Sequence, residues 1–195
     1  MSRRLHALVI GNGAYVNTDK LSNPANDAED LSRRLEICGF TVIQKADSTH
    51  KGMDLALEEF QDVLEESDVG LFFFAGHGVQ IKGENYLLGV DVKVRDELSV
   101  KHSSLALNKI IEVMEASKCE TSIVILDACR DDPFARGWTR SVYGRGLAPV
   151  YAPRGTLIAY ATSPGQTASD GAGRNGDYTA ALLQHLTTPD CSIET

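Results

Sequence analysis

Several features that would place a chain in a broad class are missing from this sequence. None of its apolar runs approaches the roughly 18 residues needed for a membrane-spanning helix. Its 19 lysines and arginines form no dense basic run, and 27 aspartates and glutamates bring the formal net charge to −8. We therefore expect neither a nucleic acid nor a membrane as a partner, whereas a basic peptide or protein segment suits the acidic surface.

The cysteines are few and follow no pairing pattern. The sequence has four, and they include no CxxC pair and no spacing typical of a disulfide framework. The chain begins Met-Ser-Arg-Arg, and the short apolar run that follows does not resemble a signal peptide. These observations predict a cytoplasmic protein with reduced thiols. We expect three of the cysteines to be small buried side chains, namely Cys38, Cys119 and Cys191.

The sequence does contain a repeated alternation of apolar strands and amphipathic helices. With 195 residues, 43% of them hydrophobic, it fits one globular domain with a sizeable core. The alternation predicts an α/β fold of three layers, in which a mostly parallel sheet is flanked by helices. Strands are predicted at 5–11, 40–44, 69–76, 85–91, 121–128 and 155–163, and helices at 23–39, 51–67, 105–117 and 176–186.

Two of the predicted strands end at residues that carry chemistry. The strand in VGLFFFAGHG (69–78) is expected to stop before His77, which would lie in a turn between two glycines. The strand in TSIVILDAC (121–129) is followed by Cys129. The carboxyl ends of parallel strands meet at one edge of a sheet, and neighbouring strands lie about 4.8 Å apart. If these strands are neighbours, the thiol and the imidazole come close together.

A cysteine beside a histidine supplies the parts for acyl transfer, most simply peptide hydrolysis. The imidazole accepts the thiol proton, stabilises the thiolate and later protonates the departing amine. Backbone N–H groups of Gly78 and Cys129 would face the developing oxyanion. The other interpretation is that a lone histidine or cysteine is only structural. A zinc site here would need two further ligands, and none is evident, so we predict no metal site.

The sequence resembles the caspase-like cysteine peptidases, and more specifically their bacterial metacaspase and orthocaspase branch. The resemblance is carried by two motifs, FFFAGHGVQ and VILDACRDDPF. The similarity continues in ALVIGNGAY, LSNPANDAEDLSRRLEICGF, NYLLGVD and GTLIAYATSPGQTASDG, which follow the family's order over almost the whole chain. It implies the caspase-haemoglobinase fold, with His77 as general base and acid, Cys129 as nucleophile, and the amides of Gly78 and Cys129 as the oxyanion hole.

The resemblance also implies how a single peptidase domain, 1–195, is divided. Residues 1–129 correspond to the large subunit of caspases, 130–154 to the loop that is cut between the subunits, and 155–195 to the small subunit. The family fold commonly continues with another strand and helix, so we expect the small-subunit part to be truncated. We further expect a monomer and a regulatory domain beyond Thr195.

The metacaspase branch cleaves after arginine or lysine, and the resemblance places its pocket acids at Asp27 and Asp127. A carboxylate pair would bind a guanidinium through charge-assisted hydrogen bonds. An acid in the first turn of a helix, as at Asp27, is also ordinary dipole chemistry. Arg130 leaves a preference for acidic residues as an alternative. The other expected cleft residues are Ala75, where the family often has serine, and Thr162 and Ser163 in a segment that would pair with an extended peptide.

The loop 130–154 is rich in arginine, and an enzyme that prefers arginine would be able to process itself there. The candidate positions are Arg136, Arg140, Arg145 and Arg154. The sequence requires no cofactor. The calcium-binding acids of some metacaspases cannot be mapped onto it, which leaves calcium activation open.

Two other functions are compatible with parts of the sequence. The first is an inactive caspase-like scaffold that binds proteins, although such a protein has no chemical need for His77 and Cys129. The second is a nucleotide-binding domain, suggested by GNGAYV (11–16) after the first strand. Val16 stands where the third glycine of GxGxxG would be, so this signal is weak.

Overall fold

The structure, a computed structural model, describes residues 3–129, 147–161 and 173–188, with the backbone alone at Cys129. All the predicted strands and helices are present, with their ends shifted by a few residues. Two elements, α3 and β5, were not predicted because they are too short to show a period. The elements are β1 (Leu5–Gly11), α1 (Pro24–Ile37), β2 (Phe40–Ala46), α2 (His50–Leu64), β3 (Val69–Ile81), β4 (Glu84–Leu88), α3 (Glu97–His102), β5 (Ser104–Ala106), α4 (Leu107–Ala116), β6 (Thr121–Cys129), β7 (Thr156–Tyr160) and α5 (Asp177–His185).

The sheet has a parallel body and a small antiparallel extension. Strands run parallel in the order β2-β1-β3-β6-β7. The long strand β3 pairs with β6 from Val69 to His77 and then with antiparallel β4 from Gly78 to Ile81. Strand β5 follows beside β4. The central strand therefore belongs to both parts, and His77 lies where they meet.

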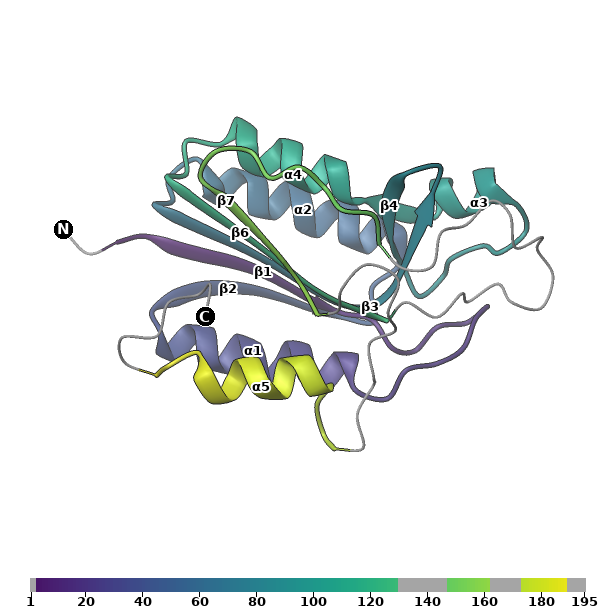
Figure 1. Ribbon diagram of the computed structural model, residues 1–195, viewed down its shortest axis with the longest axis horizontal. Coiled ribbons are helices and arrows are strands. Elements are labelled where there is room, and N and C mark those ends of the chain that lie inside the picture. Colours follow the sequence, from purple (N-terminus) through teal and green to yellow (C-terminus); the bar gives the residue numbers. More distant parts are fainter. Residues whose placement is uncertain (1–2, 130–146, 162–172, 189–195) are drawn as a thin grey trace.

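Helices cover both faces of the parallel body, as Figure 1 shows. Helices α2 and α4 lie on one face, and α1 and α5 lie on the other. This arrangement confirms the predicted three-layer α/β fold. Within the described parts of the chain, no helix is long and apolar enough to cross a membrane.

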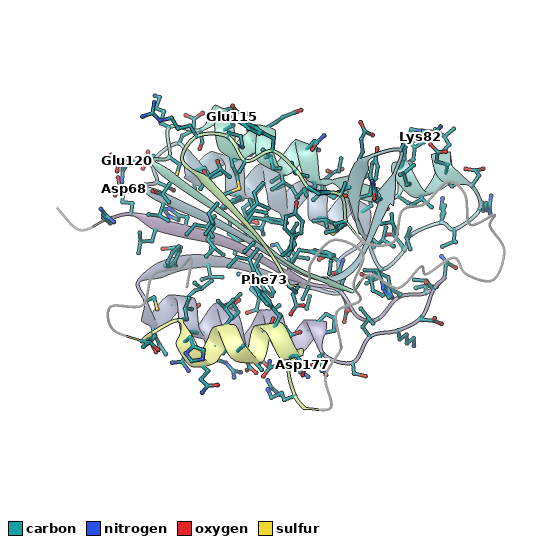
Figure 2. All side chains as sticks on the ribbon, in the orientation of Figure 1. Asp68, Phe73, Lys82, Glu115, Glu120 and Asp177 are labelled. Carbon is teal, nitrogen blue, oxygen red and sulfur yellow. The ribbon has the colours of Figure 1, made fainter. Side chains whose placement is uncertain are left out.

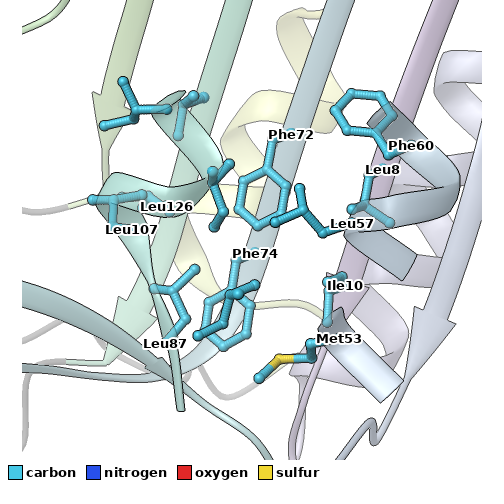
Figure 3. Packing of buried hydrophobic residues seen from close by; sticks show 14 of the residues in the cluster. Leu8, Ile10, Met53, Leu57, Phe60, Phe72, Phe74, Leu87, Leu107 and Leu126 are labelled. Atoms are coloured by element: carbon cyan, nitrogen blue, oxygen red, sulfur yellow. The ribbon is translucent and has the colours of Figure 1, made fainter. Parts of the chain in front are cut away.

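The alternation of side chains along the strands divides the core between the two helical layers. Figure 3 shows Phe72 and Phe74 of β3 in one cluster with Leu57 of α2. Phe73, labelled in Figure 2, points to the opposite face and packs with α1 and α5. Both faces of β3 are thus buried, which explains why its sequence is apolar throughout rather than alternating.

The strand that carries His77 does not end where the sequence predicted. It continues through His77 to Ile81 because the backbone exchanges one partner strand for another. Gly76 precedes the exchange with a φ of +152°, and a Cβ built there would lie 2.7 Å from the hydroxyl of Tyr15. A side chain is therefore excluded at Gly76. His77 is part of the sheet rather than of a turn, which restricts its backbone more than predicted.

The expectation that the other cysteines are buried is wrong for Cys38. It is exposed, because it follows the last turn of α1 rather than lying on the face that packs on the sheet. Cys119 is partly buried, and this burial raises the pKa of its thiol above the usual value. Cys191 lies outside the described residues.

Candidate active site

His77 is almost fully buried, with 2% of its surface exposed, and its ring has defined neighbours. Its Nε2 lies 2.8 Å from the carbonyl oxygen of Asp19. Because a carbonyl only accepts hydrogen bonds, Nε2 must carry a proton in this contact. In the neutral ring Nδ1 is then the basic nitrogen. The environment therefore selects one tautomer and assigns proton acceptance to Nδ1.

Tyr15 restrains both the ring and the backbone of His77. The two ring centroids lie 4.5 Å apart, with an angle of 43° between the rings. The backbone N–H of His77 donates to the phenol oxygen at 2.8 Å, and the phenol donates to the carbonyl of Leu88 at 3.3 Å. Tyr15 is itself 1% exposed. Tyr15 therefore restricts both the position of the imidazole and the backbone that carries it.

The segment 12–22 brings Tyr15 and Asp19 to His77. Its start is held by hydrogen bonds to the side chain of Asp47. The Oδ1 of Asp47 accepts hydrogen bonds from the N–H groups of Gly13 and Ala14, both at 2.8 Å. These amides are therefore occupied, and α1 begins only at Pro24. A phosphate cradle needs such amides and a helix that starts from the same turn. The nucleotide-binding interpretation of GNGAYV is not supported.

Cys129 is the last residue of β6, and its Cα is the register partner of His77 on β3. The prediction that these two strands are neighbours is confirmed. Since neighbouring strands lie about 4.8 Å apart, the two backbones are adjacent at the carboxyl end of the parallel body. The catalytic roles of the two residues stay a prediction.

A second row of paired residues crosses the sheet two residues before His77 and Cys129. It consists of Gly11 on β1, Ala75 on β3 and Asp127 on β6. A Cβ built on Gly11 would lie 2.0 Å from the carbonyl oxygen of Pro24, so only glycine lets the first turn of α1 approach so closely. Asp27 belongs to that first turn. Two residues of a strand span about 6.6 Å, a distance that one long side chain can bridge.

Both predicted pocket acids are buried and both contact the start of α5. Asp27 is 2% exposed and Asp127 is 7% exposed. The N–H of Gly176 donates to Oδ1 of Asp27 at 3.0 Å, and the hydroxyl of Thr179 donates to Oδ2 of Asp127 at 2.6 Å. Anions are favoured at the N-terminal end of a helix dipole. Burial, followed by the charge of Asp127, raises the pKa of Tyr178 above its usual value. The structure thus brings the two acids to one helix end.

Gly78 lies where β3 changes its partner strand. It is close to the segment that begins at Leu147. A Cβ built on Gly78 would lie 3.0 Å from the Leu147 side chain and 3.1 Å from that of Ala128. Asn85 fixes the segment by bonding both backbone groups of Ala148, at 2.7 and 2.8 Å. Packing therefore favours glycine at position 78. The role of its amide, with that of Cys129, in an oxyanion hole stays a prediction.

Of the remaining predicted residues, one lies near His77, one lies far from it, and the others are not described by the structure. Ala75 is 1% exposed and lies in the row beside Asp127. Arg154 is exposed and precedes β7, which begins opposite Ser122 at the far end of β6. At 3.3 Å per residue, Ser122 and Cys129 are about 23 Å apart, so Arg154 lies at the edge away from His77. Six further positions interpreted from the sequence lie outside the described residues, namely Arg130, Arg136, Arg140, Arg145, Thr162 and Ser163.

Three groups at this site were missed from the sequence: the carbonyl of Asp19, the ring of Tyr15 and the hydroxyl of Thr179. Every residue type has a carbonyl, so no sequence pattern identifies that of Asp19. Tyr15 belongs to GNGAYV, but the GxGxxG pattern gives a role only to the glycines. Thr179 lies in an ordinary amphipathic helix, and its contact with Asp127 joins residues far apart in the chain.

Comparison with known proteins gave one family and two relatives. The sequence model of the caspase domain matches residues 4–195. The relatives are the mucosa-associated lymphoid tissue lymphoma translocation protein 1 homolog of Mus musculus and the protein of the same name, without "homolog", of Homo sapiens. Each is 31% identical to this chain over 126 residues, or 64% of its length. The match covers only 14% of the mouse protein and 15% of the human one.

Proposed function

This chain belongs to the caspase domain family, and we propose that it is a cysteine endopeptidase that cleaves peptide or protein substrates after arginine or lysine. The observation that carries the proposal is the register of His77 with Cys129, with Asp127 two residues before Cys129 on the same strand. These positions suit a nucleophile, a base and a pocket acid that act on the same substrate residue.

The proposed reaction is acyl transfer through Cys129. Its thiol gives a proton to Nδ1 of His77, and the thiolate attacks the carbonyl carbon of the scissile bond. The negative charge on the carbonyl oxygen is stabilised by the amides of Gly78 and Cys129. As the intermediate collapses, Nδ1 protonates the leaving amine and a thioester remains. Water, deprotonated by Nδ1, then hydrolyses the thioester and restores the thiol. The carbonyl of Asp19 keeps Nε2 protonated and stabilises the imidazolium.

The proposed preference for basic residues rests on the two buried acids. The side chain of the substrate residue that carries the scissile carbonyl would extend from Cys129 towards Asp127 and Asp27. A guanidinium or ammonium there gains charge-assisted hydrogen bonds in a site from which water is largely excluded. An aspartate in the same place would meet two like charges.

Self-processing is proposed for the arginines of the 130–154 loop. A cut at Arg154 would be intermolecular, because this residue lies at the opposite edge of the sheet from His77. Accordingly, the rate of a cut at Arg154 should rise with protein concentration. A cut at Arg136, Arg140 or Arg145 made within one molecule should not depend on concentration.

A panel of fluorogenic peptides ending in arginine, lysine or aspartate, assayed with and without calcium, tests the proposal. We expect turnover of the arginine and lysine peptides and none of the aspartate peptide. Turnover of the aspartate peptide alone would instead support the acidic preference that Arg130 suggested. If none is cleaved and no thiol-reactive peptide labels Cys129, the inactive scaffold becomes the better account.

A further inference from the structure

We infer that Thr179 is a positioning residue for substrate specificity, whose hydroxyl holds the Asp127 carboxylate in the orientation that favours arginine over lysine. The inference rests on the proposed function, because it concerns the same pocket. Thr179 would not touch the substrate and would act through Asp127.

The contact between these two side chains is short and buried. Thr179 is fully buried, and its Oγ1 lies 2.6 Å from Oδ2 of Asp127. This distance is typical of a hydroxyl that donates to an ionised carboxylate, a bond about twice as strong as its neutral equivalent. The terminal torsion of an aspartate is broad, so a hydrogen bond to one oxygen restrains the plane of the carboxylate. Thr179 therefore restrains the orientation in which Asp127 presents its charge.

The helix that carries Thr179 is fixed against α1, which carries Asp27. Just before α5, whose first residue Asp177 is labelled in Figure 2, Arg174 pairs with Asp30 at 2.8 Å and with Glu29 at 2.6 Å. The hydrogen bond from Arg174 is the main cause that lowers the pKa of Asp30, so this pair stays charged at neutral pH. The contact of Gly176 with Asp27 lies in the same short segment. These contacts hold the start of α5 beside α1, and so place Thr179 near both acids.

Arginine and lysine differ in how strongly they depend on carboxylate orientation. A guanidinium is planar and binds a carboxylate with two parallel hydrogen bonds, which requires the two planes to match. An ammonium is a compact charge with rotatable donors and tolerates a rotated carboxylate. Loss of the Thr179 hydroxyl should therefore weaken arginine recognition more than lysine recognition.

The test compares Thr179→Val, which keeps the shape of the side chain, with Thr179→Ser, which keeps the hydroxyl. We expect Thr179→Val to lower the ratio of kcat/KM for arginine over lysine peptides about tenfold, and Thr179→Ser to retain the ratio. Thr41→Val, an exposed change on β2, is the matched control and should leave the ratio unchanged. Loss of folded protein lowers both kcat/KM values equally and does not move their ratio. If Thr179→Val is unfolded at the assay temperature, the ratio is read from Thr179→Ala.

The outcomes separate this inference from the function on which it rests. A wild type that cleaves neither basic peptide contradicts the proposed function and the inference with it. A wild type that prefers arginine, with the same ratio in the folded valine or alanine variant, contradicts the inference alone. A ratio that falls equally in the serine variant also contradicts it, because that variant retains the donor.

Discussion

Replacement of Cys129 by alanine is expected to lower kcat/KM for an arginine peptide by about 10⁴-fold or more. Alanine has no group that can form the thioester, and removal of the nucleophile from a cooperating pair costs nearly as much as removal of the pair. Replacement of His77 by alanine should have an effect of similar size, because the thiol then lacks its base. The double variant should be hardly worse than either single one. The measurement is steady-state hydrolysis of the fluorogenic arginine peptide.

The matched control for this prediction is Cys38→Ala, which removes an exposed thiol at the end of α1. It should keep wild-type turnover. If the loop 130–154 is self-processed, the two-band pattern on a gel should also disappear in Cys129→Ala and persist in Cys38→Ala. Near-normal turnover in a folded Cys129→Ala protein would show that the nucleophile lies elsewhere.

Replacement of Asp127 by asparagine is expected to lower kcat/KM for arginine peptides by about 10²-fold. The amide keeps the size of the side chain and an oxygen that can accept from Thr179, but it carries no charge to pair with a guanidinium. Loss of a hydrogen-bonded charge from a buried site costs about 3 kcal/mol, which corresponds to a factor of this size. The measurement is kcat/KM for the arginine peptide, with thermal unfolding as a check that the variant is folded.

Asp62→Asn is the control for the change in net charge. Asp62 is exposed on α2, which covers the opposite face of the sheet, so its loss removes the same charge without touching the pocket. It should leave kcat/KM within about twofold of wild type. An equal fall in both variants would mean that the overall acidic field, rather than Asp127, attracts basic substrates.

The layers of this fold were predictable because the sequence patterns of its strands and helices have simple physical causes. Parallel strands covered on both faces are apolar at consecutive positions, as in β3 and β6, and the helices between them carry one apolar stripe. The end of β3 was predicted wrongly because the sequence shows where an apolar run stops but not where a strand changes partner. Cys38 was predicted wrongly because the helix was expected to continue to residue 39, whereas α1 ends at Ile37 and Cys38 follows it.

The candidate site was predictable as far as it depends on side chains at the ends of strands. His77, Cys129 and Asp127 lie at the carboxyl edge of a parallel sheet, so the topology alone brings them to two rows that are two residues apart. The groups that orient them depend on contacts between distant segments. Asp19 reaches His77 through its backbone, and Thr179 reaches Asp127 from the last helix. No spacing in the sequence reports such contacts.

The most direct test of the central claim is covalent labelling with a peptide that ends in arginine and carries a thiol-reactive group. The adduct is located by intact mass and peptide mapping. We expect one adduct per chain, located on Cys129, that forms far more slowly in the His77→Ala variant. An adduct on Cys38 or Cys119 with Cys129 unmodified, or equal labelling rates with and without His77, would contradict the pairing of sulfur and imidazole from which the proposed activity follows.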